Sequence, residues 1–189
     1  LGQPRNATLN TPAAEIRFLT MKGKIVNIET ERLELVALTP TQLEWWLNDC
    51  HRLECELNCL YRAEPMEGLF RQIVAGQLAA AKRDPGHYVW HSFWFLIRKS
   101  DRTVVGSADF KDLPDSGGLV EIGYGLGREY EGRGYMTEAV CAMCRWAISQ
   151  DNVRHVTAET DLDGLASQKL LLRCGFREWK RGETLWWIL

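Results

Sequence analysis

The sequence lacks the features that mark several large classes of protein. No apolar run approaches the length of about 18 residues that a membrane-spanning helix needs. Residues 1–20 have neither the basic start nor the continuous apolar core of a secretory signal. The 23 Lys and Arg residues are balanced by 25 Asp and Glu residues, and a net charge of −2 creates no basic field that would attract nucleic acid. We therefore expect a cytoplasmic protein with neither a membrane nor a nucleic acid as its partner.

Two common ligand signatures are also missing. The phosphate-binding pattern G-x-x-x-x-G-K-[S/T] does not occur, which disfavours a nucleotide-binding protein of that class. Among the six cysteines, Cys141 and Cys144 form a C-x-x-C pair, but there is no second pair to complete a zinc site. Free cysteine is often simply a small core residue. We expect reduced thiols and no metal.

Length and composition are consistent with one globular domain. A chain of 189 residues is long enough to bury most of its surface around one core. We expect residues 21–189 to form this domain. Residues 1–20 carry little periodicity and are expected to be an N-terminal extension, with Met21 as a possible natural start.

Hydrophobic periodicity predicts alternating groups of strands and helices. Period-two alternation is typical of strands, and spacings of three and four residues are typical of helices. The predicted strands cover residues 32–38, 89–97, 103–111, 120–126, 154–160, 176–181 and 184–189. The predicted helices cover residues 40–61, 65–84, 134–150 and 165–173. This order predicts a mixed α/β fold, with antiparallel hairpins in the middle of the sheet and helices on its faces.

The stretch from Glu121 to Ala139 combines a strand, a glycine-rich loop and the start of a helix. Gly132 and Gly134 flank Arg133 just before the helical spacing begins. Such a loop presents bare backbone N–H groups at a helix N-terminus, where the helix dipole also favours an anion. The pattern therefore predicts a site for a phosphate-bearing ligand.

Four segments in order resemble the GNAT N-acetyltransferases and, within that family, the RimJ/RimL-type branch. They are residues 28–35, residues 105–110, residues 121–124 with 131–139, and residues 159–167 with 170–176. The resemblance implies a central twisted, mostly antiparallel sheet of six to seven strands flanked by about four helices. It also implies an acetyl-CoA-dependent enzyme that transfers an acetyl group directly, in a ternary complex, to a primary amine. The acceptor would be a protein N-terminal α-amine or a small amine, and the protein would be a monomer or a homodimer.

The same resemblance assigns residues to acetyl-CoA. The pantetheine arm would lie between two splayed strands, with backbone N–H groups near Leu126 facing the thioester oxygen. The residues implied in cofactor binding are Gly125, Leu126, Gly127, Gly132, Arg133, Gly134, Tyr135, Met136, Thr137 and Thr160. Three residues depart from the family pattern: Glu131 replaces Gln or Arg, Met136 replaces a small residue, and Gly164 replaces asparagine. These departures motivate an alternative function, a catalytically idle acyl-CoA-binding or regulatory module.

For the catalytic residues the sequence leaves more than one role open. Glu121 is the candidate general base, although it could also be an exposed strand residue, and Glu159 on the neighbouring strand is the alternative base. The position of the tyrosine acid used by many members of the family is occupied by Leu171. Ser167 is the candidate donor to the departing sulfur, or else the N-cap of its helix. Trp45 lies off the apolar stripe of its helix and is a candidate for lining the acceptor cleft, together with Glu121.

Overall fold

The computed structural model describes residues 17–20 and 26–189, and the chain forms one large sheet with helices on both faces. The strands are β1 (Arg17–Thr20), β2 (Val26–Glu29), β3 (Leu33–Ala37), β4 (Leu60–Tyr61), β5 (Phe93–Arg98), β6 (Thr103–Phe110), β7 (Leu119–Leu126), β8 (His155–Asp161), β9 (Arg177–Arg181) and β10 (Thr184–Ile188). The α-helices are α1 (Pro40–Asn48), α2 (Cys50–Leu57), α3 (Gly68–Arg83), α4 (Tyr135–Ile148) and α5 (Leu165–Arg173). Two short 3₁₀ segments, η1 (Pro85–Trp90) and η2 (Arg128–Tyr130), complete the order.

The sheet order is β1-β2-β3-β5-β6-β7-β8-β10-β9, and β4 pairs with β6 at the side. All pairings are antiparallel except β4 with β6 and β7 with β8. This confirms the mixed, mostly antiparallel architecture. Among the described residues the sheet has ten strands rather than six to seven, because β1 and β4 were not recognised in the sequence and β2 was not separated from the opening strand. Most of the expected extension and Met21 lie outside the described residues.

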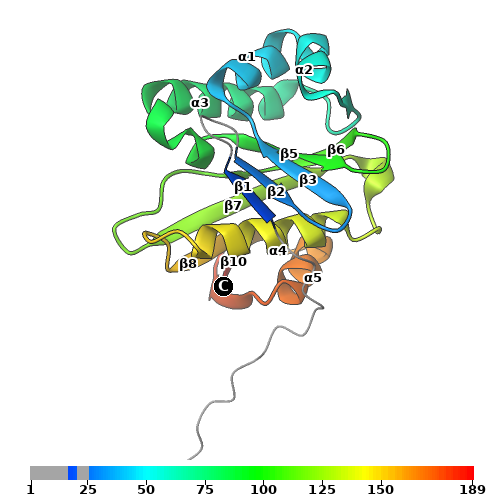
Figure 1. The fold of residues 1–189 in the computed structure, drawn as a ribbon. Helices are drawn as coiled ribbons and strands as arrows, with labels where there is room; N and C mark the ends of the chain where they lie inside the picture. The colour runs from blue at the N-terminus through cyan, green and yellow to red at the C-terminus, as the bar shows by residue number, and fades with distance from the viewer. Residues whose placement is uncertain (1–16, 21–25) are drawn as a thin grey trace, which may run out of the picture.

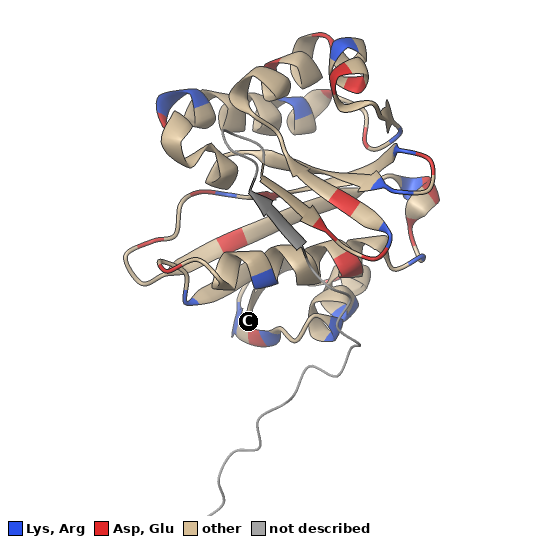
Figure 2. Ribbon diagram, in the orientation of Figure 1, with Lys and Arg blue, Asp and Glu red and all other residues tan. Residues whose placement is uncertain are grey.

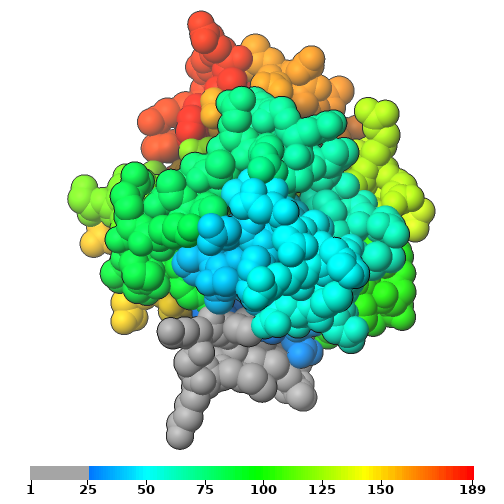
Figure 3. Space-filling view, turned by 90° about the horizontal axis from the view of Figure 1, so that it is seen from above, coloured from blue at the N-terminus to red at the C-terminus, as the bar shows by residue number. Residues whose placement is uncertain are grey.

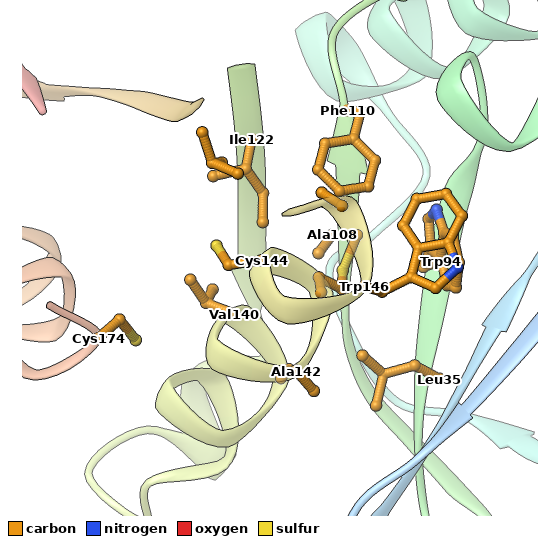
Figure 4. Close-up of a cluster of buried hydrophobic side chains, with 14 of the residues drawn as sticks. Leu35, Trp94, Ala108, Phe110, Ile122, Val140, Ala142, Cys144, Trp146 and Cys174 are labelled. Atoms are coloured by element: carbon orange, nitrogen blue, oxygen red, sulfur yellow. The ribbon is translucent and has the colours of Figure 1, made fainter. Parts of the chain in front are cut away.

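Helices α1, α2 and α3 cover one face of the sheet, and α4 and α5 cover the other (Figure 1). Both layers of helices carry charged residues of both signs (Figure 2). Viewed from above, the blue, cyan and green segments that include α1 to α3 fill the middle of the near side, and red and orange segments of the C-terminal part lie at the upper edge (Figure 3). A separate hydrophobic core lies on each face. On the α4 face, Trp146 packs against Trp94 with ring centroids 5.0 Å apart, and Ile122 and Val140 extend this core towards α5 (Figure 4). In the described part of the chain no helix is long and apolar enough to cross a membrane.

The single helix expected over residues 40–61 is wrong. The chain breaks at Asp49, whose N–H donates to the Trp45 carbonyl at 2.7 Å and ends α1. The Asp49 carboxylate then accepts from the Arg52 N–H at 3.2 Å and caps α2. Aspartate competes for backbone hydrogen bonds in this way, and so favours helix ends over helix interiors.

The strand expected from Val89 starts late, at Phe93, because a 3₁₀ segment occupies residues 85–90. The Asp84 carboxylate lies 3.0 Å from His87 Nδ1 and 3.6 Å from His91 Nε2, which ties this turn together. These contacts supply the partners that the sequence did not show for the two histidines. Helix α3 begins at Gly68, three residues later than predicted.

Candidate functional site

Strands β7 and β8 separate after a short parallel contact. Their register pairs residues 119–121 with residues 155–157, although β7 continues to Leu126 and β8 to Asp161. Over residues 157–161 β8 remains paired with β10. A gap therefore opens beside the second half of β7.

The free edge of β7 presents main-chain groups to this gap. The Gly127 N–H donates to the Val105 carbonyl at 2.9 Å, and the Lys111 N–H donates to the Glu121 carbonyl at 3.0 Å. Main-chain groups alternate sides along a strand, so the odd-numbered residues of β7 are bonded to β6. The N–H groups of Tyr124 and Leu126 consequently face the gap.

The glycine-rich loop has the geometry of an anion site. Gly132 and Gly134 adopt positive φ angles of 71° and 79°, a region that side chains disfavour. Gly134 is the N-cap of α4 and supplies no side chain to cap it. The N–H groups of the first turn, from Tyr135 to Thr137, precede the first helical hydrogen bond, from the Glu138 N–H to the Gly134 carbonyl. They are therefore available to an anionic ligand.

The turn between β2 and β3 fixes this loop from outside. Glu138 in the first turn of α4 accepts from Thr30 Oγ1 at 2.6 Å, the Arg32 N–H at 2.8 Å and Arg32 Nε at 2.7 Å. Arg32 Nη1 also donates to the Arg133 carbonyl at 2.9 Å, and its guanidinium lies 4.6 Å from the Tyr135 ring centroid. Sequence reasoning used this segment as a family strand motif and missed its contact with Glu138, more than a hundred residues away.

Removing the Arg32 side chain should loosen the loop without unfolding the domain. The ion pair is partly exposed, so we expect Arg32→Ala to lower the free energy of unfolding by about 1 kcal/mol. The lost hydrogen bond to the Arg133 carbonyl should weaken binding of acetyl-CoA severalfold in calorimetric titration. Arg128→Ala, an exposed site on the same connection, is the control. Equal acetyl-CoA affinity in both variants would contradict a role for Arg32 in shaping the loop.

A groove of about 380 Å³ extends from the loop along the gap. Its walls come from β7, the glycine loop, the start of α4 and the exposed side of α5. The lining residues are Tyr124, Gly125, Leu126, Glu131, Gly132, Gly134, Met136, Thr137, Ala166, Ser167, Lys169, Leu170 and Arg173. Lys169 and Arg173 add two positive charges near the loop. These two residues were not predicted from the sequence, because their spacing on α5 indicated ordinary solvent-exposed positions.

A second groove of about 400 Å³ continues from the first. Its lining residues are Lys111, Glu121, Ile122, Gly123, Tyr124, Glu159, Thr160, Asp161, Gly164, Ser167 and Thr184. The two grooves share Tyr124 and Ser167. One continuous path therefore joins the anion-binding loop to a pair of glutamates.

Glu121 and Glu159 differ in environment. Glu121 is half-buried, and this burial raises the pKa of its carboxyl group, with smaller contributions from Glu159 and Asp109 that the Lys111 ammonium partly offsets. Glu159 is exposed and accepts a hydrogen bond from Thr184 Oγ1 at 2.5 Å. Of the two, Glu121 has the environment of a general base.

The junction between the grooves carries two hydroxyl groups. Ser167 lies inside α5, whose N-cap is Gly164, so the expected N-cap role of Ser167 is wrong. The buried Tyr124 hydroxyl has no hydrogen-bond partner in the described part of the chain. Burial raises the pKa of Tyr124 to about 12, and the neighbouring Ser167 side chain opposes this shift. Sequence reasoning used Tyr124 as a strand residue of the cofactor motif and assigned no role to its hydroxyl group. Leu171, at the position of the family's tyrosine acid, is fully buried.

The comparison with known families decides the identity of this arrangement. The acetyltransferase (GNAT) domain family matches residues 32–177, well over half of the chain. The chain belongs to the GNAT acetyltransferase family.

Curated relatives are named as N-acetyltransferases. The chain is 34% identical over 96 residues to the uncharacterized N-acetyltransferase YjdG of Bacillus subtilis (strain 168), covering 50% of this chain and 57% of the relative. It is 26% identical over 155 residues to the uncharacterized N-acetyltransferase YoaA of the same organism, covering 80% and 82%. With the first two relatives, YjdG and the N-acetyltransferase p20 of Bacillus licheniformis, the match spans only about half of the relative's length, 57% and 48%.

Solved structures share the GNAT fold. A ribosomal-protein-S5-alanine acetyltransferase from Vibrio fischeri superposes with a TM-score of 0.61 at 18% identity, covering 87% of this chain and 96% of the other. RimL, a ribosomal L7/L12 α-N-protein acetyltransferase in complex with coenzyme A, superposes with a TM-score of 0.57 at 16% identity, covering 85% and 94%. The neighbours thus include proteins of the branch that the sequence motifs resemble.

The three departures from the GNAT pattern have visible consequences. Glu131 is exposed at the rim, and Lys169 and Arg173 line the same groove. Met136 is 6% exposed and packs into the core under α4, where it also lines the first groove. In the turn that ends at Gly164, Gln168 Nε2 donates to the carbonyls of Asp161 and Leu162 at 2.9 and 3.1 Å. Gln168 thereby steadies the turn without an asparagine.

Of the remaining predicted cofactor residues, Thr160 lines a groove, whereas Gly127, Arg133 and Tyr135 belong to neither lining. The Arg133 side chain is exposed, Tyr135 is half-buried beneath Arg32, and Gly127 is buried against the backbone of residues 62–63. Thr160 lines the second groove, and its hydroxyl accepts from Trp187 Nε1 at 3.0 Å.

Two further sequence candidates stand apart from the grooves. Trp45 is half-buried on α1 with the Arg52 guanidinium 4.2 Å from its ring centroid, and it belongs to neither lining. Its contact with the acceptor stays a prediction. The Cys141 and Cys174 sulfurs lie 2.9 Å apart between α4 and α5. Within residues 17–20 and 26–189, no group of three or more His, Cys, Asp or Glu side chains is arranged so that it could hold a metal ion.

Proposed function

We propose that the protein transfers the acetyl group of acetyl-CoA directly to a primary amine in a ternary complex. The observation that carries this proposal is the continuous path from the orphan N–H groups of the glycine loop to the half-buried Glu121 carboxylate. An anionic cofactor at one end and an amine at the other would meet beside β7. GNAT acetyltransferases act on amine acceptors, which fits this arrangement.

The residues present fit acetyl-CoA. The loop offers uncapped helix N–H groups to a diphosphate, Lys169 and Arg173 add positive charge, and the gap exposes the β7 edge to a thioester. The orphaned Tyr124 hydroxyl lies buried at the junction of the two grooves, where polar atoms of the cofactor would pass. Acetyl-CoA, when bound, supplies the activated acetyl thioester.

The chain then supplies three functions. The N–H groups of Tyr124 or Leu126 donate to the carbonyl oxygen as negative charge develops there, a contribution typically of about 10²–10³ in rate. Glu121 accepts the proton that the acceptor ammonium must lose before its nitrogen can attack. Ser167 donates a hydrogen bond to the departing sulfur, with the Tyr124 hydroxyl behind it.

The proposal is tested by incubating the protein with acetyl-CoA and each of a panel of primary amines. The coenzyme A released is measured by chromatography. We expect release that depends on both the protein and the amine, together with saturable binding of acetyl-CoA in calorimetry. Binding without release on any amine would instead favour the idle acyl-CoA-binding module. The absence of binding would contradict the assignment of the cofactor groove.

A further inference from the structure

Glycines occupy the second half of one face of β7 and the residue that follows the strand. Gly123, Gly125 and Gly127 alternate on the face towards α3 and the segment that precedes it. A Cβ atom at each would lie within 3 Å of a neighbouring group: Lys111 Nζ at 2.6 Å, Glu64 Oε2 at 2.6 Å and the Arg62 carbonyl at 2.9 Å. The glycines therefore allow polar groups from other elements to sit directly on the strand.

The Glu64 carboxylate is one of these groups, and it lies against Gly125. Glu64 belongs to the connection between β4 and α3 and is half-buried. Its main-chain carbonyl accepts from Tyr61 Oη at 2.6 Å. No described residue donates a hydrogen bond to its carboxylate or forms an ion pair with it, and partial burial raises its pKa.

Asp109 shows how the fold satisfies a comparable carboxylate when its role is structural. It lies against Gly123 and is 2% exposed. Gln77 Nε2 donates to its Oδ2 at 3.1 Å, and Lys111 Nζ lies 3.7 Å from the same oxygen. Desolvating a carboxylate is costly, and the contacts with Gln77 and Lys111 offset part of this cost for Asp109, whereas no described residue does so for Glu64.

The position of Glu64 relates it to the acceptor. Gly125 lies between Tyr124 and Leu126, the residues whose N–H groups face the gap. Glu64 is outside the lining of both grooves, so it is set back from the reacting atoms. Glu121 lies four strand residues away from Gly125, about 13 Å along β7. A single acceptor nitrogen would not reach both carboxylates, but an acceptor with two positive charges could use each for a different group.

We propose that Glu64 determines acceptor specificity by binding a second positive charge of the acceptor. The inference rests on the proposed function and names its substrate class: a primary amine that carries another cationic group a few bonds away. The second amino group of the acceptor does not react and can remain a protonated ammonium. An ion pair with the Glu64 carboxylate stabilises this charged form. The reacting nitrogen must instead lose its proton, which is the task of Glu121.

Paired acceptors that differ by one charge test this role. The kcat/KM of coenzyme A release is compared for 1,4-diaminobutane and butylamine, and for the dipeptide amides Ala-Lys and Ala-Leu. We expect the dicationic member of at least one pair to be preferred by about tenfold or more, the usual scale of a hydrogen bond to a charged group. The pair that shows the preference tells whether the charge comes from a small diamine or from a peptide.

Glu64→Gln keeps the shape of the side chain and removes its charge. We expect this variant to lose the preference because its KM for the dicationic acceptor rises. Its kcat, and the decrease of activity at acidic pH that the base causes, should be unchanged. Glu64→Asp should restore part of the preference, and Glu67→Gln, an exposed glutamate on the same connection, should leave it intact.

Three outcomes would overturn the inference. The first is equal kcat/KM for both members of each pair with the unchanged protein. The second is an intact preference for the dication in Glu64→Gln. The third is a lower kcat in Glu64→Gln together with loss of the fall in activity at acidic pH, which would make Glu64 the base. Each of them requires turnover, so none is confused with failure of the proposed function, in which no amine releases coenzyme A.

Discussion

Glu121→Gln is expected to lower kcat by about 10²–10⁴-fold, the usual contribution of a general base. The amide keeps the size of the side chain but accepts no proton. Acetyl-CoA affinity should be unchanged, because Glu121 lines only the second groove. Glu159→Gln is the matched control, since its carboxylate lines the same groove but is exposed and bonded to Thr184. If Glu159→Gln shows the larger loss, the two glutamates must exchange roles.

The activity of the protein should decrease at acidic pH if Glu121 is the base. The pKa of Glu121 is raised, first by burial and then by Glu159 and Asp109. Its base form is therefore lost at a higher pH than for an ordinary glutamate, and activity should fall as the pH drops through that raised value. The Gln variant should lack this acidic limb. An unchanged limb in the variant would assign it to another group.

Replacing Glu121 by Gln should lower activity but should not lower the free energy of unfolding at neutral pH. A carboxyl group with a raised pKa binds its proton more tightly in the folded state than in the unfolded state. Its contribution to stability is present below the unfolded pKa and is lost as the pH rises through the folded pKa. At neutral pH the charged Glu121 thus disfavours folding, so Glu121→Gln should unfold at an equal or higher urea concentration than the parent protein. A stability loss at neutral pH would point to a structural role.

Local signals in the sequence located much of this fold. The helix predicted over residues 165–173 matches α5 from Leu165 to Arg173, and α4 and β6 differ from prediction by one or two residues at their ends. The glycine pair before α4 also lies where its spacing indicated. These features depend on neighbouring residues, so a pattern within a few turns is enough to reveal them.

Features that depend on distant contacts were not predictable. The strand β4 exists only because it pairs with β6, whereas the break at Asp49 rests on local hydrogen bonds that the apolar stripe of the helix does not reveal. Glu138 binds Arg32 across 106 positions, and Glu64 reaches Gly125 from a different element. No periodicity records such contacts. The candidate base could be identified from a motif, whereas the groups that surround it needed the structure.

Gly134→Ala is expected to weaken acetyl-CoA binding by about tenfold or more. The residue has a φ of 79°, and its Cβ would lie 3.4 Å from Arg32 Nη2. A side chain in this left-handed region costs about 1–2 kcal/mol. The loop can relieve that strain by rotating, which would turn the first N–H groups of α4 away from the diphosphate. Losing one such hydrogen bond to a charged group accounts for the expected change.

Gly68→Ala separates this effect from backbone strain alone. Gly68 also has a positive φ, 54°, at the start of α3, and its Cβ would meet nothing within 4 Å. Both variants should therefore lose a similar amount of stability in urea unfolding, but only Gly134→Ala should raise the Kd for acetyl-CoA in calorimetry. Gly132→Ala, with a φ of 71° and open space around it, provides a second loop variant should Gly134→Ala unfold. If both loop variants bind acetyl-CoA as tightly as Gly68→Ala does, the diphosphate is held elsewhere, because the anion site requires the geometry that these glycines allow.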